Sequence, residues 1–349
     1  MRTKLLGHSG LRVSEICLGT MTFGETWGPI GADREVARAI YGAYRARGGN
    51  FVDTANGYQG GASETLLAEF IAEERDRVVV ATKYTLSTSP DDPNACGNHR
   101  KNMVQAVEKS LRRLATDYID LYYVHIWDFM TPAEEVLRAL DDLVRAGKVL
   151  YVGISDTPAW IVSRCNAIAE LRGWSAFVGL QIEYNLLERT PERDLLPMAR
   201  ALDIGVTAWG PLASGVLSGK HAGGISGDTG RARMAGARVD ERSHKIVETV
   251  MAIAGELGRT PAQVALNWLR QGPFPTIPIV GARKLAQIED NLACLDFQLS
   301  AEQLARLNAA SAIEPGFPHG FIDSEFVRGA LFGKTFGLID NHRAGRGGA

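Results

Sequence analysis

Four side chains that could move protons are expected close together in this chain. Asp53, Lys83 and His125 each end a short apolar run, and Tyr58 lies in the loop after Asp53. A free tyrosine has a pKa of about 10 and is a poor acid at neutral pH. A nearby ammonium favours the phenolate and lowers that pKa, so we expect Lys83 to assist Tyr58. Asp53 would balance the lysine's charge, and His125 would orient a substrate oxygen that becomes negative.

Taken singly, these residues have ordinary explanations. An aspartate after a strand is often a turn former, a lysine at a rim is usually solvated, and a histidine after apolar residues is often packed in the core. The convergence of all four favours chemistry. No nucleophile-plus-base pair accompanies them, so acyl transfer is not indicated. His125 and Asp128 lack a third ligand of fitting spacing, and no metal site is predicted.

The elements that must position these side chains alternate regularly. Eight strand-sized apolar runs are separated by helix-sized amphipathic stretches. The runs are Ile16–Leu18, Asn50–Asp53, Val78–Lys83, Ile119–His125, Val149–Ile154, Val178–Ile182, Gly205–Trp209 and Thr276–Val280. The helical stretches include Asp33–Arg47, Glu64–Glu73, Arg100–Leu114, Pro132–Ala146 and Pro158–Arg172. Strands that are apolar throughout, with helices between them, are typical of a parallel sheet covered by helices.

The number of these units favours an α/β fold of the closed (β/α)8 TIM-barrel type over an open sheet. An open dinucleotide-binding sheet needs a Gly-x-Gly-x-x-Gly motif after its first strand, which this sequence lacks there. In a barrel the carboxyl ends of all strands lie on one face, and neighbouring strands are about 5 Å apart. Asp53, Lys83 and His125 end consecutive strands, so this fold brings them into one small region.

Three further segments interrupt the alternation. Thr3–Glu15, with glycines between two extended runs, predicts an N-terminal β-hairpin that plugs the bottom of the barrel. Pro211–Asp240 is a long loop after strand 7 without strong periodicity, and such loops are usually functional or disordered. The tail from Glu314 is rich in Gly and Phe, and residues 343–349 are expected to fray. We expect a single barrel domain over residues 1–349.

Composition narrows the class of protein. The chain has 349 residues, a hydrophobic fraction of 45% and a net charge of −2, which suit a large folded core and give no nucleic-acid footprint. Its four cysteines are far apart, which indicates reduced thiols rather than disulfides or a zinc site. The first residues lack the apolar stretch of a secretion signal, and no apolar run could span a bilayer. We expect a cytoplasmic protein with no nucleic-acid or membrane partner.

The order of motifs along the chain resembles the aldo-keto reductases. The matching stretches, within residues 3 to 310, are Phe51–Tyr58 with Ser63–Glu64, Ala81–Lys83, Leu121–His125, Gly153–Ser155, Gln181–Asn185, Trp209–Leu212 and Pro278–Asn291. The resemblance implies a bacterial NADP(H)-dependent oxidoreductase that reversibly reduces an aldehyde or ketone by hydride transfer from the nicotinamide C4. The family's catalytic tetrad falls on Asp53, Tyr58, Lys83 and His125, with Tyr58 as general acid.

The resemblance also implies the residues that bind the cofactor. At the nicotinamide end they are Ser155, Asp156 and Gln181 for the carboxamide, and Trp209 for stacking on the ring. Elsewhere they are Leu212, Ser214, Gly215 and Lys220 over the pyrophosphate, Gly281 and Arg283 at the 2′-phosphate, and Gln287 and Asn291 towards the adenine. A guanidinium suits a phosphate because its donors form a fixed fork, and the segment from Gly281 is expected to open a helix, whose N-terminus attracts anions.

Two positions depart from the residues that the family usually carries. Asp156 stands where many members have asparagine, and a carboxylate only accepts hydrogen bonds, so the carboxamide contact is weakened or redirected to the carboxamide nitrogen. Trp209 replaces a common tyrosine and keeps a stacking face. The candidates for an apolar substrate pocket just beyond the strand ends are Phe23, Trp27, Tyr84 and Trp127.

Three other functions stay open from the sequence. Lys83 could form a Schiff base with a carbonyl substrate, which would make the protein a lyase. The fold and motifs also resemble potassium-channel β subunits, which would make it a cofactor-binding regulatory subunit. The same chemistry could run as a catabolic dehydrogenase with NAD. The small-molecule substrate and the oligomeric state are not indicated.

Overall fold

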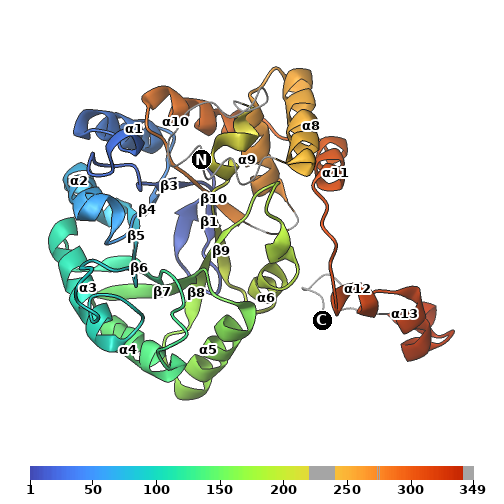
Figure 1. Ribbon diagram of the computed structural model, residues 1–349, viewed down its shortest axis with the longest axis horizontal. Coiled ribbons are helices and arrows are strands. Elements are labelled where there is room, and N and C mark those ends of the chain that lie inside the picture. The colour runs from blue at the N-terminus through green and yellow to red at the C-terminus, as the bar shows by residue number, and fades with distance from the viewer. Residues whose placement is uncertain (220–239, 273, 275, 341–349) are drawn as a thin grey trace.

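Eight parallel strands close into a barrel in the part of the chain that the computed structural model describes, residues 1–340 apart from 220–239, 273 and 275 (Figure 1). The strands run in the order β10-β3-β4-β5-β6-β7-β8-β9 around the barrel. They are β3 (Cys17–Gly19), β4 (Phe51–Asp53), β5 (Val79–Tyr84), β6 (Ile119–Val124), β7 (Val149–Ser155), β8 (Phe177–Glu183), β9 (Gly205–Trp209) and β10 (Thr276–Val280). The predicted (β/α)8 barrel is confirmed, and each predicted run matches its strand to within one residue at either end.

Helices ring the barrel on its outer side (Figure 1). They are α1 (Arg34–Ala46), α2 (Ala62–Ile71), α3 (Arg100–Leu114), α4 (Ala133–Arg145), α5 (Ala159–Arg172), α6 (Leu195–Ala201), α8 (Glu241–Leu257), α9 (Pro261–Gln271), α10 (Leu285–Leu292) and α11 (Ala301–Ala310). Side-chain caps fix several of their starts. The Asp33 carboxylate accepts from a first-turn N–H of α1, and Thr260 and Ser300 form capping boxes at α9 and α11.

Side chains fill the barrel interior. Tyr123 of β6 is fully buried there, and its hydroxyl lies 3.4 Å from Thr207 Oγ1 of β9. Gly153 of β7 leaves the room that this ring needs, because a Cβ at that position would overlap the Tyr123 ring. The interior is therefore a packed core that supports the strand ends, as in other barrels of this type.

A β-hairpin closes the amino-terminal end of the barrel. β1 (Thr3–Leu5) and β2 (Arg12–Ser14) pair antiparallel. Leu6 and Val13 are buried among the interior side chains. Gly7 has a φ of 53°, and a Cβ there would lie 2.5 Å from Gly205 N and from Val178 O, near the starts of β9 and β8. The predicted plug at the bottom of the barrel is confirmed, and the opposite face is left free for a site.

After α11 the chain leaves the barrel and forms a small helical arm. Its elements are α12 (His319–Ile322), α13 (Glu325–Phe332) and the 3-10 turn η7 (Phe336–Leu338), which stand away from the barrel at the lower right of Figure 1. The residues 343–349 that were expected to fray lie outside the described residues. Among the described residues, no helix is long and apolar enough to cross a membrane.

Candidate active site

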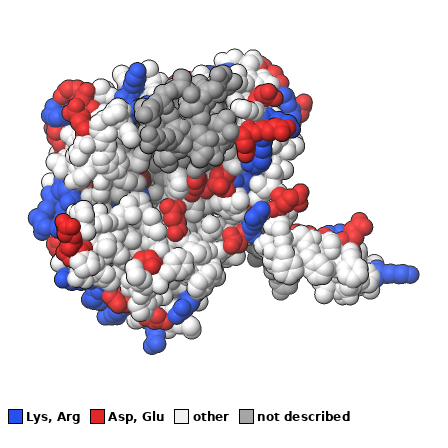
Figure 2. Space-filling view, viewed as in Figure 1, with Lys and Arg blue, Asp and Glu red and all other residues white. Residues whose placement is uncertain are grey.

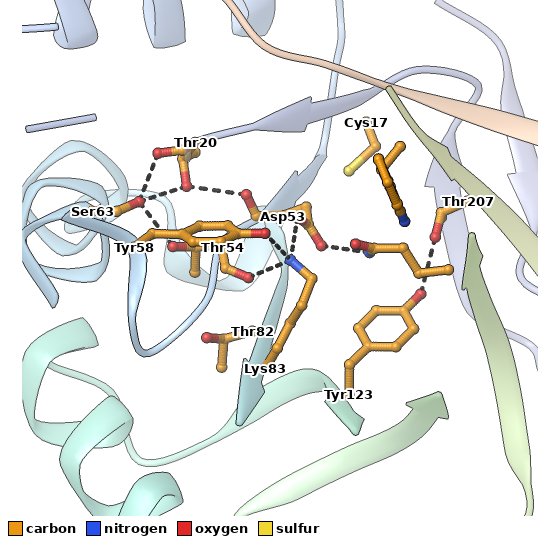
Figure 3. Close-up of polar contacts among 12 residues, drawn as sticks. Cys17, Thr20, Asp53, Thr54, Tyr58, Ser63, Thr82, Lys83, Tyr123 and Thr207 are labelled. Atoms are coloured by element: carbon orange, nitrogen blue, oxygen red, sulfur yellow. Dashed lines mark hydrogen bonds and ion pairs between the residues drawn. The ribbon is translucent and has the colours of Figure 1, made fainter. Parts of the chain in front are cut away.

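Asp53, Tyr58, Lys83 and His125 meet at the carboxyl ends of three neighbouring strands. Asp53 ends β4, Lys83 is the penultimate residue of β5, and His125 follows β6. Lys83 Nζ donates to Asp53 Oδ2 at 2.5 Å, to the Thr54 carbonyl at 2.8 Å and to Tyr58 Oη at 3.1 Å (Figure 3). An ammonium has three N–H donors, so every donor of this buried lysine has a partner.

A short 3-10 turn, η2 (Tyr58–Gly61), carries Tyr58. Gln59 adopts a φ of 52°, and its side chain accepts from Trp27 N at 2.8 Å and donates to Met21 O at 3.2 Å. These bonds tie the Tyr58 loop to the loop after β3. The Tyr58 ring is half-buried and meets the Trp27 and His125 rings edge-on, with centroids 6.3 and 5.9 Å away. The Tyr58 hydroxyl is thus hydrogen-bonded to Lys83, while its ring contacts the rings of Trp27 and His125.

Electrostatics keep Lys83 charged and Tyr58 protonated. Burial acts to lower the pKa of Lys83, but the Asp53 carboxylate and the Tyr58 oxygen outweigh burial and raise it. Burial raises the pKa of Tyr58, and Lys83 offsets only part of that rise. The predicted effect of the ammonium on the tyrosine has the right sign, but the predicted net lowering of the Tyr58 pKa is wrong. Here the unfavourable effect of removing the phenolate from water is larger than the favourable effect of the Lys83 charge.

His125 is a neutral imidazole at ordinary pH. Burial first, and then the Lys83 charge, lower its pKa to about 3. Its Nδ1 is buried and has no hydrogen-bond partner among the described residues. The nearby Asp128 carboxylate accepts from the backbone N–H groups of Met130 and Thr131. His125 can therefore hydrogen-bond a bound molecule without bringing a charge to it.

Ser155, Gln181 and Trp209 lie on the next three strands of the barrel. Ser155 ends β7 and is the register partner of Gln181 on β8, and Trp209 ends β9. Gln181 Nε2 donates to Asp53 Oδ1 at 2.8 Å, which joins this group to the lysine cluster. Ser155 Oγ is buried and finds no partner in the described part of the chain. An unsatisfied buried hydroxyl marks a position where a ligand could bond.

Asp156 has a protein partner that the sequence did not indicate. Trp209 Nε1 donates to Asp156 Oδ1 at 3.0 Å. Burial raises the pKa of Asp156, and the indole N–H opposes that rise. The residue has a φ of 40°, and its backbone N–H donates to Gln181 O at 3.2 Å. The carboxylate therefore fixes the orientation of the Trp209 indole, whatever contact it makes to a ligand.

The candidate pyrophosphate loop begins at a kinked 3-10 turn after β9. Leu212 precedes this turn, η5 (Ala213–Ser218), and within it Ser214 and Gly215 have φ values of 56° and 98°. Positive φ turns the backbone N–H groups away from the usual helical direction, as in turns that bind anions. Lys220, also predicted on this loop, lies outside the described residues.

The candidate 2′-phosphate residues lie between β10 and α10. Arg283 Nη1 donates to Pro29 O at 2.8 Å, which links it to the loop after β3, and its buried Nε has no partner among the described residues. Its backbone N–H donates to the Gln287 side chain at 2.9 Å. Helix α10 begins only at Leu285, so Gly281 and Arg283 precede the helix rather than open it. Asn291 is buried near the end of α10.

Sequence reasoning missed a buried hydroxyl cluster beside the Tyr58 loop. Ser63 Oγ lies 2.8 Å from Thr20 Oγ1 and 2.9 Å from Thr54 Oγ1, and it donates to Thr20 O (Figure 3). Thr20 Oγ1 in turn donates to Asp53 O at 3.0 Å. This cluster joins the ends of β3 and β4 to α2. A hydroxyl residue directly after each of two strands was the available signal.

The sequence also did not indicate that the carboxylate of Glu64 is buried and joins several elements. Glu64 of α2 is fully buried and accepts from Thr82 Oγ1 of β5 and from Arg113 Nε of α3, both at 2.6 Å. Its bonds hold α2 and α3 to β5, the strand that carries Lys83. Glu64 appeared in the sequence only as part of a motif, because nothing local shows which partners it reaches.

Three of the four aromatic residues expected in a substrate pocket belong to the core instead. Phe23 and Tyr84 are fully buried, and Trp127 is 7% exposed. Tyr84 stacks on Tyr122 at 5.3 Å. The pocket prediction is wrong for these three, because their rings are packed in the core between strands and helices. Only Trp27, at 40% exposed and beside Tyr58, keeps the expected position.

Comparisons with known proteins give one family. A model of the aldo/keto reductase family matches residues 15–312, so the match ends before the helical arm. Norsolorinic acid reductase of Aspergillus flavus is 37% identical over 327 residues, covering 91% of this chain and 83% of its own. The NADP(+)-dependent aryl-alcohol dehydrogenase of Phanerodontia chrysosporium is 38% identical over 330 residues, covering 89% and 86%. A putative aryl-alcohol dehydrogenase of Saccharomyces cerevisiae is 36% identical, covering 91% and 88%.

Proposed function

Since the chain belongs to the aldo/keto reductase family, we propose that it interconverts an aldehyde or ketone and its alcohol with NADP(H), and that Tyr58 is the proton donor. The observation that carries the proposal is the buried Lys83 ammonium, which bonds Tyr58 Oη and the Asp53 carboxylate together. It places a positive charge beside the hydroxyl oxygen of Tyr58, from which the proton would leave. The neutral His125 ring meets the ring of the same tyrosine edge-on, with the centroids 5.9 Å apart.

The side chains around Trp209 fit a nicotinamide cofactor. The unpartnered Ser155 Oγ, the Gln181 amide and the part-exposed Trp209 ring offer polar groups and a stacking face, which a planar ring with a carboxamide needs. Arg283 supplies a guanidinium for a phosphate. When bound, the reduced cofactor supplies the hydride, and the oxidised cofactor accepts one.

The proton step follows from the bonds that Tyr58 makes. In reduction, the phenol gives its proton to the carbonyl oxygen as hydride reaches the carbonyl carbon, and the product is the alcohol. Lys83 stabilises the phenolate that remains, and Asp53 keeps the lysine charged. His125, being neutral, donates a hydrogen bond to the same oxygen. In oxidation, the phenolate takes the hydroxyl proton back while hydride leaves the carbon.

We further propose an aromatic carbonyl compound or its alcohol as the substrate. Large apolar side chains stand exposed on the loops that follow β3 and β6, at the same face as Tyr58. They are Met21, Trp27, Phe129 and Met130, with exposed fractions of 37, 40, 67 and 84%. An exposed apolar rim beside a polar site favours a flat apolar ligand with one polar group. The names of the relatives, a reductase of norsolorinic acid and aryl-alcohol dehydrogenases, agree with this class.

The lyase alternative finds no support in the state of Lys83. A Schiff-base lysine must be deprotonated to attack a carbonyl. The pKa of Lys83 is raised, and each of its N–H donors already has a partner.

A substrate panel tests the proposal. Benzaldehydes, aryl ketones, aliphatic aldehydes and sugars are each mixed with NADPH, and its absorbance is followed; borohydride is added to a parallel set. We expect NADPH oxidation, fastest for the aryl carbonyls, and no substrate trapped on Lys83. Trapping on Lys83 would support the lyase. Cofactor binding without turnover of any carbonyl would support the regulatory subunit.

The choice between NADP and NAD is tested by direct binding. Arg283→Ala is expected to weaken NADPH binding at least about tenfold and to leave NADH binding nearly unchanged, because only NADPH brings the 2′-phosphate. Quenching of Trp fluorescence measures both. Lys284→Ala, one residue on and exposed, is the control. Equal affinity of the unaltered protein for NADPH and NADH would refute the phosphate assignment.

A further inference from the structure

The helical arm, residues 313–340, carries apolar side chains that no other described part of the chain covers. None of these residues is buried, and all of them are described. Nine large apolar side chains on the arm are at least 40% exposed: Phe317, Phe321, Ile322, Phe326, Leu331, Phe332, Phe336, Leu338 and Ile339. The arm stands away from the barrel as a largely uncharged projection in Figure 2. Apolar patches of this extent mark interaction surfaces on folded proteins.

The arm is too small to be stable by itself. α13 has eight residues and α12 has four. Isolated helices shorter than about 12–15 residues are marginal in water and depend on packing of an apolar face. Within the arm, the Phe317 and Phe321 rings lie 6.3 Å apart and the Phe332 and Phe336 rings 5.2 Å apart, which are small contacts for a folded unit. Its helices therefore need a partner surface.

The root of the arm is held on the barrel. Arg193 Nε and Nη2, at the barrel end before α6, donate to the Glu314 carbonyl at 3.1 and 2.9 Å. This bond directs the chain outward from a fixed point. An arm that is anchored at its root presents its apolar end in a defined direction. This suits a specific contact between two copies better than a freely moving tail would.

The exposed area is enough for a stable interface. An aromatic or large aliphatic side chain carries roughly 150–200 Å² of surface, so these nine, which are 40 to 86% exposed, offer on the order of 900 Å². A stable protein interface needs about 800 Å² from each partner. One arm can thus supply its whole share of an interface.

The order of charges on the arm is complementary to itself. Asp323 and Glu325 precede or begin α13, and Lys334 follows its end. Two copies of α13 that cross antiparallel at their centres bring both acids of one chain beside Lys334 of the other, twice by symmetry. Arg328 is already over its own Phe336 ring, 5.1 Å from the centroid. Such a two-fold contact is self-complementary and closed, which stops growth at two chains.

We propose that the arm is a dimerisation element whose occupant is the arm of a second copy of this chain, paired antiparallel through α13. The proposal does not rest on the proposed reaction. It concerns a surface outside the family's matched region and away from Tyr58.

A charge exchange between two variants tests the pairing. Lys334→Glu makes the arm acidic, and Asp323→Lys with Glu325→Lys makes it basic. One chain has a mass of 37.8 kDa. We expect the unaltered protein to sediment with twice that mass, as a dimer, at micromolar concentration. Each variant alone should dissociate at least about tenfold more readily, and a 1:1 mixture should recover the dimer. Carbonyl turnover by every variant should stay within about twofold, because the arm lies outside the site.

Two further variants distinguish loss of the dimer contact from a failure of the chain to fold. Phe326→Asp on the arm is expected to give a folded monomer, and Leu171→Asp, on the barrel helix α5 and 87% exposed, is expected to leave the dimer intact. A monomeric unaltered chain, a dimer that survives Phe326→Asp, or a mixture that fails to recover would each overturn the proposal. So would a monomer whose arm binds lipid vesicles instead of a second copy.

Discussion

At the scale of single residues, the candidate site is a balance between burial and one ion pair. Burial acts to lower the pKa of Lys83 and to raise the pKa of Tyr58. The Asp53 carboxylate reverses the first effect, and the charged lysine moderates the second. The result is a tyrosine that stays protonated at neutral pH, as the proposed proton donor must before the reaction. That property suits a general acid better than a permanently ionised tyrosine would.

The Lys83–Asp53 pair predicts a characteristic stability pattern. Lys83→Met leaves the Asp53 carboxylate buried without its partner, which should cost about 3–5 kcal/mol of unfolding free energy. Adding Asp53→Asn removes the stranded charge and should recover a large part of that loss. Urea unfolding of the two variants and the unaltered chain measures both effects. A double variant as unstable as the sum of the single ones would contradict the pairing.

His125 predicts a pH dependence of stability. Its pKa is about 3 in the folded chain and about 6.5 when unfolded. Between these values the unfolded state binds a proton that the folded state does not, so the unfolding free energy rises with pH and is lost as the pH falls below about 6.5. One proton contributes at most about 1.4 kcal/mol per pH unit. Urea unfolding from pH 4 to 6.5 should show a flatter slope for His125→Gln; an unchanged slope would mean that His125 is protonated when folded.

At the scale of elements, the site depends on how α2 is fastened. Glu64 joins α2 to β5 and α3 through bonds that are all buried at the carboxylate. Those elements hold the Tyr58 turn and the strand of Lys83. A change on the outer helices can therefore reach the site through the position of Tyr58.

Glu64 and Arg113 should be strongly coupled. Glu64→Ala is expected to cost about 3 kcal/mol, because it removes a fully buried carboxylate that accepts from Thr82 and from the part-buried Arg113 guanidinium. The Glu64→Ala, Arg113→Ala double variant should cost less than the two single variants together, as measured by urea unfolding. Glu69→Ala, whose carboxylate pairs with Arg34 and Arg38 at the surface, is the control and should cost below about 1 kcal/mol. Additive losses at Glu64 and Arg113 would refute the coupling.

The sequence predicts the strands well and the contacts between them poorly. Apolar runs of strand length are a strong local signal, so all eight strands match to within a residue. The bond between Asp156 and Trp209 joins β7 to β9 across the intervening β8, and only the curvature of the barrel brings them together. The sign of the Tyr58 pKa shift depends on the depth of burial, which spacing does not encode. The helices of the arm are short, and the sequence predicted only a tail rich in Gly and Phe there.

At the scale of the whole molecule, the two ends of the barrel have different tasks. The hairpin seals one end with Leu6 and Val13, and the strand ends at the other carry the candidate site. The arm extends the molecule beyond the barrel (Figure 1). The hairpin, the candidate site and the proposed dimer contact thus lie in separate regions, and variants can test them independently.

The tight fit of the hairpin predicts that alanine substitutions at its two glycines change the unfolding free energy by very different amounts. Gly7→Ala should lower the unfolding free energy by about 2–4 kcal/mol, because its Cβ meets backbone atoms and its φ is positive. Gly10→Ala, where nothing lies within 4 Å of the new Cβ, should change it by less than about 0.5 kcal/mol. Urea unfolding compares them. Similar values for the two would mean that the hairpin does not sit tightly against the strands.

The role of Tyr58 as proton donor is tested most directly by Tyr58→Phe, which removes one oxygen from the site. Cofactor affinity from fluorescence quenching and single-turnover rates of an aryl aldehyde are measured on the variant and on the unaltered chain. We predict that NADPH affinity stays within about threefold, because the nicotinamide residues are untouched, while the rate falls at least about 100-fold. A Tyr58→Phe protein that binds NADPH and keeps its rate within tenfold of the unaltered chain would contradict the account.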